Sequence, residues 1–292
     1  MEGVAAELCL PSPLAELRDS RLAGTGVRVW LKRDDLIHPA MPGNKWRKLK
    51  YNLAAARDQG HRRLLTFGGA FSSHIRATAV AGQRLGFQTV GVIRGEEHLP
   101  LNETLAEAAG HGMVLTYMDR ETYRHKTDPA VLAALLERFG PAYMIPEGGS
   151  NALAVRGCAE LPAEVGVAFD VMCCACGTGT TLAGIAAGLA GAPARALGFS
   201  VLKGGQFLAG EVRRLQVAAY GNATGNWSVE YGYHFGGYAK RTPGLDAFAA
   251  DFAAAQGITL DWVYEAKMLY GLFGMLAAGR FPAGARVVAV LS

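Results

Sequence analysis

The chain has 292 residues, half of them hydrophobic and only 18% charged, which excludes a disordered or fibrous protein and leaves room for one large domain or two smaller ones. Its formal net charge of +4 is too small, and its basic residues are too dispersed, to indicate a nucleic-acid partner. No apolar run approaches the roughly 20 residues of a membrane span, and the first residues lack the basic start of a secretion signal, so we expect no membrane partner. The five cysteines are an odd number and favour a reducing cytoplasm over a disulfide framework.

Apolar runs rich in β-branched residues alternate with helical patterns along the chain. In chain order, the sequence predicts strands at 63–67, 89–93, 114–117, 142–145, 171–175 and 287–291, and helices at 73–85, 102–109, 130–138, 151–160, 180–189 and 266–278. This alternation is typical of βαβ units that form a parallel sheet with both faces covered. Residues 203–240 are less regular, and their glycines, asparagines and tyrosines predict loops near a site.

Ligands of open parallel sheets bind where the carboxyl ends of strands lead into helices, so these junctions are the candidate sites. The junction at 176–181 reads Cys-Gly-Thr-Gly-Thr-Thr. Its glycines let the backbone approach an anion, and its amides and hydroxyls can donate to a monophosphate. The spacing is that of neither a P-loop nor a dinucleotide fingerprint, and a tight turn with an ordinary helix cap is the alternative. Cys173, Cys174 and Cys176 have no second ligand cluster at compatible spacing, so we predict no metal site.

A second junction places Asn44 where it can cap a helix that begins near Lys45. A lysine in the first helical turn meets the positive end of the helix dipole, and burial adds to this effect. Both lower the lysine pKa and favour the neutral amine, the form that makes Schiff bases. On charge alone a solvated basic face is the better interpretation, and a cofactor lysine is favoured only in combination with a phosphate loop.

The third junction, Gly-Gly-Ala-Phe-Ser-Ser-His at 68–74, also joins a strand to a helix. Ser72 or Ser73 can cap this helix, and its first amides form a seat for a carboxylate. His74 can orient a substrate or cofactor, whereas the plainer interpretation is an N-cap beside a surface histidine. No Gly-x-Ser-x-Gly elbow and no evident Ser-His-Asp order supports hydrolysis by a triad.

A Schiff-base lysine, a phosphate loop and a carboxylate seat together suit pyridoxal phosphate and a small amino-acid substrate. From about Leu31 to Ser292 the chain resembles the fold-type II (tryptophan synthase β-like) pyridoxal phosphate enzymes, in the branch of 1-aminocyclopropane-1-carboxylate deaminase and D-cysteine desulfhydrase. The segments that carry the resemblance are Lys-Arg-Asp-Asp at 32–35, Gly-Asn-Lys-Trp-Arg-Lys-Leu at 43–49, Gly-Gly-Ala-Phe-Ser-Ser-His-Ile-Arg at 68–76, Pro-Glu-Gly-Gly-Ser-Asn at 146–151, Gly-Thr-Gly-Thr-Thr at 177–181 and Val-Tyr-Glu-Ala-Lys at 263–267.

The resemblance implies an α/β, two-domain parallel-sheet fold. Residues 1–48 and 153–292 would form a larger cofactor-binding domain, and residues 49–152 a smaller inserted domain. It also implies a homodimer. Because family members continue with a glycine-rich stretch beyond the position of Ser292, we expect the native chain to be longer.

The resemblance further implies a role for each site residue. Lys45 would carry the cofactor and move the proton at the substrate's α-carbon, and Lys48 would help to neutralise the phosphate. Ser72 would contact the substrate carboxylate or act on the substrate directly. Ser73 departs from the family, which usually has an asparagine at this position. The remaining residues would be Gly177, Thr178, Gly179, Thr180 and Thr181 at the phosphate, Glu265 at the pyridine nitrogen, and His74, Tyr238 and Tyr264 near the substrate.

The resemblance identifies the family more specifically than it identifies the substrate. Glu265 is the deaminase-like choice, because an acidic partner keeps the pyridine ring protonated, whereas His74, the loop at 148–151 and Ser292 resemble the desulfhydrases. We therefore expect a β-elimination of the D-cysteine desulfhydrase kind, which gives pyruvate, ammonia and sulfide. The alternatives are 1-aminocyclopropane-1-carboxylate deaminase, a non-catalytic pyridoxal phosphate binder suggested by Ser73, and a nucleotide-binding protein that uses the same glycine loop.

Overall fold

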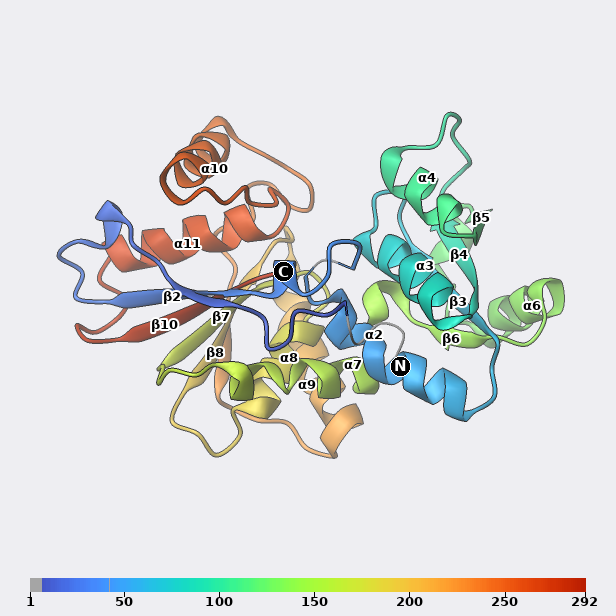
Figure 1. The fold of residues 1–292 in the computed structure, drawn as a ribbon, viewed down its shortest axis with the longest axis horizontal. Helices are drawn as coiled ribbons and strands as arrows, with labels where there is room; N and C mark the ends of the chain where they lie inside the picture. The colour runs from blue at the N-terminus through green and yellow to red at the C-terminus, as the bar shows by residue number, and fades with distance from the viewer. Residues whose placement is uncertain (1–6, 42) are drawn as a thin grey trace. The chain divides into compact units, whose positions relative to one another are not determined.

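The computed structural model describes residues 7–41 and 43–292, which divide into two α/β units (Figure 1). The smaller unit contains the described residues up to Cys9 together with Ile37–Ala154, and the larger unit contains Leu10–Leu36 and Val155–Ser292. Each unit has its own sheet and its own hydrophobic core. The expected class, α/β with parallel sheets, is confirmed.

The smaller unit has a four-stranded parallel sheet in the order β5-β4-β3-β6. Its strands are β3 Arg63–Gly68, β4 Gln88–Arg94, β5 Met113–Met118 and β6 Tyr143–Ile145. Its helices are α2 Lys45–Asp58, α3 Ser73–Leu85, α4 Glu103–Gly110, α5 Arg120–Arg124 and α6 Pro129–Phe139. The strands and helices predicted here are confirmed apart from small shifts at their ends, and only the short α5 was not predicted.

Helix α3 begins and ends where its sequence requires. Ser72 is the N-cap, with its Oγ accepting from the Ile75 amide at 3.4 Å, and Gly86 ends the helix in the left-handed conformation. Ile75 packs in one apolar cluster of the unit and Val80 in another, so the helix is buried on two sides. This double burial fixes the start of α3 at the carboxyl end of β3, where the serine junction lies.

The larger unit has a six-stranded sheet in the order β1-β2-β10-β7-β8-β9, parallel except for the β1–β2 pair. Its strands are β1 Leu14–Glu16, β2 Arg28–Arg33, β7 Val171–Cys176, β8 Arg195–Ser200, β9 Trp227–Glu230 and β10 Arg286–Leu291. Its helices are α8 Thr180–Gly188, α9 Leu208–Tyr220, α10 Pro243–Gln256 and α11 Glu265–Ala277, while α7 Ala152–Cys158 crosses the boundary between the units in sequence.

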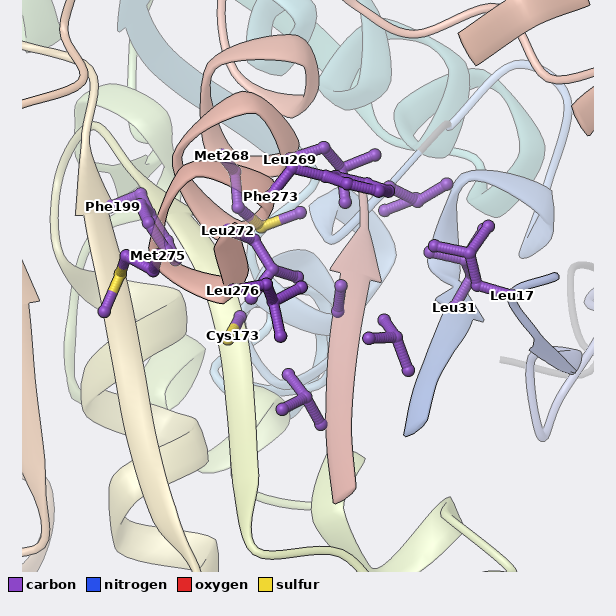
Figure 2. Close-up of a cluster of buried hydrophobic side chains, with 14 of the residues drawn as sticks. Leu17, Leu31, Cys173, Phe199, Met268, Leu269, Leu272, Phe273, Met275 and Leu276 are labelled. Carbon is purple, nitrogen blue, oxygen red and sulfur yellow. The ribbon is translucent and has the colours of Figure 1, made fainter. Parts of the chain in front are cut away.

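The core of the larger unit gathers around α11. Figure 2 shows Leu272 and Leu276 of this helix in one cluster with Leu31 of β2 and Cys173 of β7. Full burial of one such leucine contributes about 2 kcal/mol. The apolar face of α11 therefore anchors the helix on the sheet and fixes the position of its first turn, which carries Glu265.

The expectation of loops throughout residues 203–240 is wrong. This stretch contains α9 and β9, and the sequence also failed to indicate β2, β8 and α10. In α9 the buried apolar positions are Leu208, Val212, Leu215 and Ala219, a regular helical spacing, but glycines and tyrosines in and around the helix obscure it. The expected helix 151–160 is shorter, because Cys158 ends it.

The division into units differs from the expected boundaries at the described residues up to Cys9 and at residues 37–48 and 153–154, which group with the smaller unit; the longest of these stretches is 37–48. The physical reason is the continuity of α2. Trp46, Leu49 and Leu53 of this helix share one core with Ile37 and with residues of α3, so the helix packs as one piece. Within residues 7–41 and 43–292, no helix combines the length and apolar character needed to cross a membrane.

Candidate active site

Two lysines lie at the start of α2 in the smaller unit. Lys45 is the first residue of the helix and half-buried, and Lys48 lies one turn further and is buried. Asn44 occupies the N-cap position without a side-chain cap, because its Oδ1 accepts instead from Lys45 Nζ at 3.1 Å. The expected capping role of Asn44 is therefore wrong, and its side chain orients the Lys45 amine.

The loop at 146–151 packs against this lysine turn. Gly148 and Gly149 both have positive φ, and a Cβ on Gly149 would lie 3.2 Å from His74 Cε1 and 3.4 Å from Lys48 Cβ. Asn52 joins the loop to α2, since its Nδ2 donates to the Lys48 carbonyl at 2.8 Å and its Oδ1 accepts from Asn151 at 2.6 Å. The glycines allow close contact, and the asparagine pair holds the loop against the helix.

His74 is buried, not a surface residue. Its Nε2 lies 2.8 Å from the Thr66 hydroxyl, which donates its proton to the Ile145 carbonyl at 2.9 Å. A hydroxyl that gives its proton to a carbonyl can only accept from the imidazole, so His74 is the Nε2–H tautomer. Burial first, and then the charges of Lys45 and Lys48, lower the pKa of His74 to about 3. His74 is therefore neutral, and it can reach a ligand only through Nδ1.

Ser72 and Ser73 open α3 at the end of β3. The capping role predicted for Ser72 is confirmed. A Cβ at Gly68 would lie 2.6 Å from Ile75 Cγ1 and 2.8 Å from Ser72 Oγ, so only glycine lets the strand end this close to the helix. The first amides of α3 are thus held by a rigid junction, and such helix-start amides suit a carboxylate.

The glycine loop of the larger unit joins β7 to α8. Gly179 is the N-cap of α8 with φ of 76°, and the buried Thr180 and Thr181 form the first helical positions. Thr178 Oγ1 and Thr180 Oγ1 lie 3.1 Å apart. Gly179 has no side chain that could cover the start of the helix. The backbone amides and threonine hydroxyls there are groups that suit an anion. The remaining members of the loop are Gly177 and Thr178.

Tyr264 lies beside this loop, and Tyr238 lies next to Tyr264. A Cβ on Gly177 would be 3.1 Å from Tyr264 Cε1, and the rings of Tyr264 and Tyr238 are 6.0 Å apart in an edge-on arrangement. Tyr264 is held at the start of α11, where its amide donates to Asp261 Oδ2 at 2.7 Å. The structure therefore brings the phosphate loop and both predicted tyrosines together in one unit.

Lys267 was missed as a site residue by the sequence argument. It is fully buried, and its Nζ donates to the carbonyls of His234 and Gly237 at 3.1 and 2.8 Å. Those carbonyls belong to the turn that carries Tyr238, in which Phe235 and Gly237 have positive φ. Lys267 thus stabilises the turn that presents Tyr238, and the segment 263–267 was the signal that could have identified it.

Glu265 is a buried carboxyl with two backbone donors. Its Oε1 accepts from the Ser292 amide at 2.6 Å, and its Oε2 accepts from the Asp261 amide at 3.0 Å. Burial first, and then the charges of Asp261 and Asp35, raise the pKa of Glu265 to about 7 against the opposing effect of the two N–H donors. This carboxyl gains or loses its proton near neutral pH.

The residues present fit pyridoxal phosphate. The loop at 177–181 offers glycines at positions that a Cβ would crowd, next to helix-start donors that suit a phosphate. Glu265 is a buried acid that suits a ring nitrogen, and Lys45 at the start of α2 suits a carbonyl group. Among residues 7–41 and 43–292, no cluster of three or more histidine, cysteine, aspartate or glutamate side chains is placed to hold a metal ion.

Comparison with known proteins agrees with this geometry. Residues 6–292 match the family described as pyridoxal-phosphate dependent enzyme. The chain is 33% identical over 293 residues to D-cysteine desulfhydrase of Klebsiella pneumoniae, covering 93% of this chain and 88% of that one. It is 32% identical over 284 residues to the mitochondrial bifunctional D-cysteine desulfhydrase/1-aminocyclopropane-1-carboxylate deaminase of Arabidopsis thaliana, covering 90% of this chain and 71% of the relative.

A solved structure of an ACC deaminase homologue superposes with a TM-score of 0.85 at 27% identity, covering 96% of this chain and 88% of that chain. The chain therefore belongs to the fold-type II pyridoxal-phosphate dependent enzymes, in the family of 1-aminocyclopropane-1-carboxylate deaminase and D-cysteine desulfhydrase, and it is a lyase or deaminase whose cofactor is pyridoxal phosphate.

Proposed function

We propose that this enzyme eliminates the β-substituent of a small D-amino acid, as a D-cysteine desulfhydrase does, and releases pyruvate, ammonia and sulfide. The observation that carries the proposal is the tyrosine pair at the glycine loop. Tyr264 lies against Gly177 and Tyr238 lies against Tyr264, so one phenol would lie beside the phosphate and the second next to the first. A phenol can donate a proton to a departing thiolate.

The smaller unit would supply the groups that hold the substrate and move its proton. Lys45 would bind the cofactor covalently and accept the α-proton, with Asn44 orienting its amine. Ser72 and the first amides of α3, joined by Ser73, would hold the substrate carboxylate. His74 is neutral and offers only Nδ1, so it would act as a hydrogen-bond acceptor in substrate binding.

The larger unit would supply the groups that hold the cofactor. Residues 177–181 would bind its phosphate through backbone amides and threonine hydroxyls. Glu265 would face the pyridine nitrogen and hold a proton there. When bound, pyridoxal phosphate stores the electrons that the substrate's α-carbon releases.

One specific observation favours a second function, 1-aminocyclopropane-1-carboxylate deamination. That substrate has no α-proton, and opening its ring needs a strongly electron-withdrawing cofactor. The buried carboxyl of Glu265 favours a protonated pyridine, which is the stronger electron sink. A third reading, a cofactor-binding protein without activity, is motivated by Ser73, which is shorter than the usual asparagine.

A single comparison separates these functions. One preparation loaded with pyridoxal phosphate is given D-cysteine and 1-aminocyclopropane-1-carboxylate in parallel, and pyruvate and 2-oxobutyrate are measured. Faster pyruvate formation supports the desulfhydrase proposal, and faster 2-oxobutyrate formation overturns it. If neither product forms from these or from a panel of D- and L-amino acids, the chain binds the cofactor without this chemistry. The homodimer and the cytoplasmic location stay predictions.

A further inference from the structure

Three ends of secondary structure lie close together around Glu265 within the larger unit, and two of them donate an amide to its carboxyl. Strands β2 and β10 are parallel neighbours in which Arg33 pairs with Leu291, so both strands end at the same edge of the sheet. Ser292 follows β10 and donates its amide to Glu265. The 3-10 turn Asp34–Leu36 follows β2 and contacts β10. The loop that precedes α11 supplies the third end through the Asp261 amide.

An ion pair occupies the end of β2. Arg33 Nε donates to Asp35 Oδ1 at 2.9 Å, and Arg33 Nη2 donates to Asp35 Oδ2 at 2.7 Å, a two-point contact. The side chains are only 19% and 25% exposed, so solvent screens them less than it screens an ordinary surface pair. Arg33 and Asp35 form one of the motifs that the family resemblance highlighted, but the proposed mechanism has not used them.

Both members of the pair act on Glu265. The negative charge of Asp35 raises the pKa of Glu265, and the charge of Glu265, after that of Asp35, raises the pKa of Arg33. Electrostatic attraction is mutual, so Arg33 favours the ionised form of Glu265. The charge of Asp261 also raises the pKa of Glu265, whereas Lys267 on the same helix is directed to the carbonyls of His234 and Gly237.

We propose that Arg33 and Asp35 are positioning residues that set the charge of Glu265 in opposite directions and, through it, the protonation of the cofactor's pyridine nitrogen. The second half of this statement rests on the proposed role of Glu265. An ion pair that served only to join strand ends would contribute to stability alone, and loss of either partner would have the same sign. A charge-setting pair differs because loss of its two members has opposite signs.

The first test titrates Glu265 in the cofactor-free chain, by the carbon-13 shift of its carboxyl, assigned with Glu265→Gln. Asp35→Asn leaves the Arg33 cation and should lower the midpoint by about half a pH unit or more, while Arg33→Met leaves the Asp35 carboxylate and should raise it similarly. The double variant should return close to the wild-type midpoint. Shifts of the same sign, or no shift in either variant, overturn the proposal.

The chain contains a matched control in the same sheet. Arg286 and Asp170 also form an Arg–Asp pair, with Nη2 and Oδ1 2.9 Å apart, but at the opposite end of β10. A strand of six residues spans roughly 20 Å, about twice the screening length of physiological salt. Asp170→Asn should therefore leave the Glu265 midpoint unchanged. If Arg33→Met folds poorly, Arg33→Lys is used in addition. Because this variant keeps the positive charge, the Glu265 midpoint should stay close to that of the wild type.

The second test adds pyridoxal phosphate and follows the pH dependence of its visible absorbance. The midpoint should move in opposite directions in Asp35→Asn and Arg33→Met. A cofactor midpoint that ignores both variants while Glu265 responds overturns the link to the pyridine nitrogen. A chain that fails to bind the cofactor contradicts the proposed function, whereas opposite shifts in the cofactor-free chain still support the action of the pair on Glu265.

Discussion

Each unit buries an ionisable side chain near its candidate site residues, His74 in the smaller unit and Glu265 in the larger, but burial changes their pKa values in opposite directions. Burial and two lysine charges lower the pKa of His74 to about 3, so that it is neutral throughout the functional range. Glu265 is also buried, and its pKa is raised to about 7. Burial favours the neutral form of both groups, but two amides favour ionised Glu265, whereas the bond from His74 to Thr66 uses the neutral form. One site holds a fixed acceptor, and the other holds a group that titrates.

The largest expected effect tests whether the lysine turn is the reactive one. Lys45→Ala should abolish the visible absorbance of bound pyridoxal phosphate and lower kcat by about a thousandfold or more, because the same amine binds the cofactor and moves the proton. Absorbance spectra and product assays measure both. Lys50→Ala on the same helix is the control. If Lys48→Ala loses the absorbance while Lys45→Ala keeps it, the roles of the two lysines are reversed.

The next effect concerns the phosphate loop of the larger unit. Gly179→Val places a branched side chain at φ of 76° and a Cβ 3.0 Å from Val212 Cγ2, so affinity for pyridoxal phosphate should fall at least about tenfold. Gly191→Val is the matched control, since Gly191 has φ of 81° and open space around its Cβ position. Both variants carry backbone strain of about 1–2 kcal/mol. Equal cofactor affinity in the two variants would show that the loop is an ordinary turn and does not bind the phosphate.

The next prediction concerns Glu265 and the pH dependence of the unfolding free energy of the cofactor-free chain. The pKa of Glu265 is raised on folding, so the folded chain binds the proton more tightly, and stability is lost as pH rises from the ordinary value of 4.5 toward 7. Relative to Glu265→Gln, the wild type should lose about 2 kcal/mol of unfolding free energy between pH 5 and 8. Urea unfolding of the larger unit at several pH values gives this difference. Parallel curves for the two proteins would mean that Glu265 does not titrate in this range.

The smallest expected effect tests whether His74 is held neutral. Thr66→Val removes the acceptor of His74 Nε2–H and should cost about 1–2 kcal/mol of unfolding free energy. Thr89→Val, a buried threonine on the next strand, is the comparison. In the wild type, the imidazole resonances of His74 should not change from pH 5 to pH 8. A titration within that range would show that His74 gains a charge and is not a fixed acceptor.

Local sequence was sufficient for much of the fold. The alternation of apolar runs and helical patterns indicated the parallel sheets, because residue period and turn residues are properties of short segments. The same holds for the glycine loop at 177–181 and for the start of α3 at Ser72. It was not sufficient for α9, whose regular spacing is hidden between loops, or for the membership of residues 37–48, which depends on the core that α2 shares with α3.

What the sequence determined by itself is the set of chemical groups: a lysine at a helix start, glycines at two strand ends, an acid at the start of α11. Tertiary structure alone decided their states. His74 is neutral because it is buried and lies near Lys45 and Lys48, and Thr66 and Ile145, eight and 71 positions away, define its tautomer. Glu265 titrates near neutrality because burial and the charges of Asp261 and Asp35 raise its pKa, while the amides of Asp261 and Ser292 oppose the rise. Burial and charge depend on neighbours that are distant in sequence, and no local pattern records them.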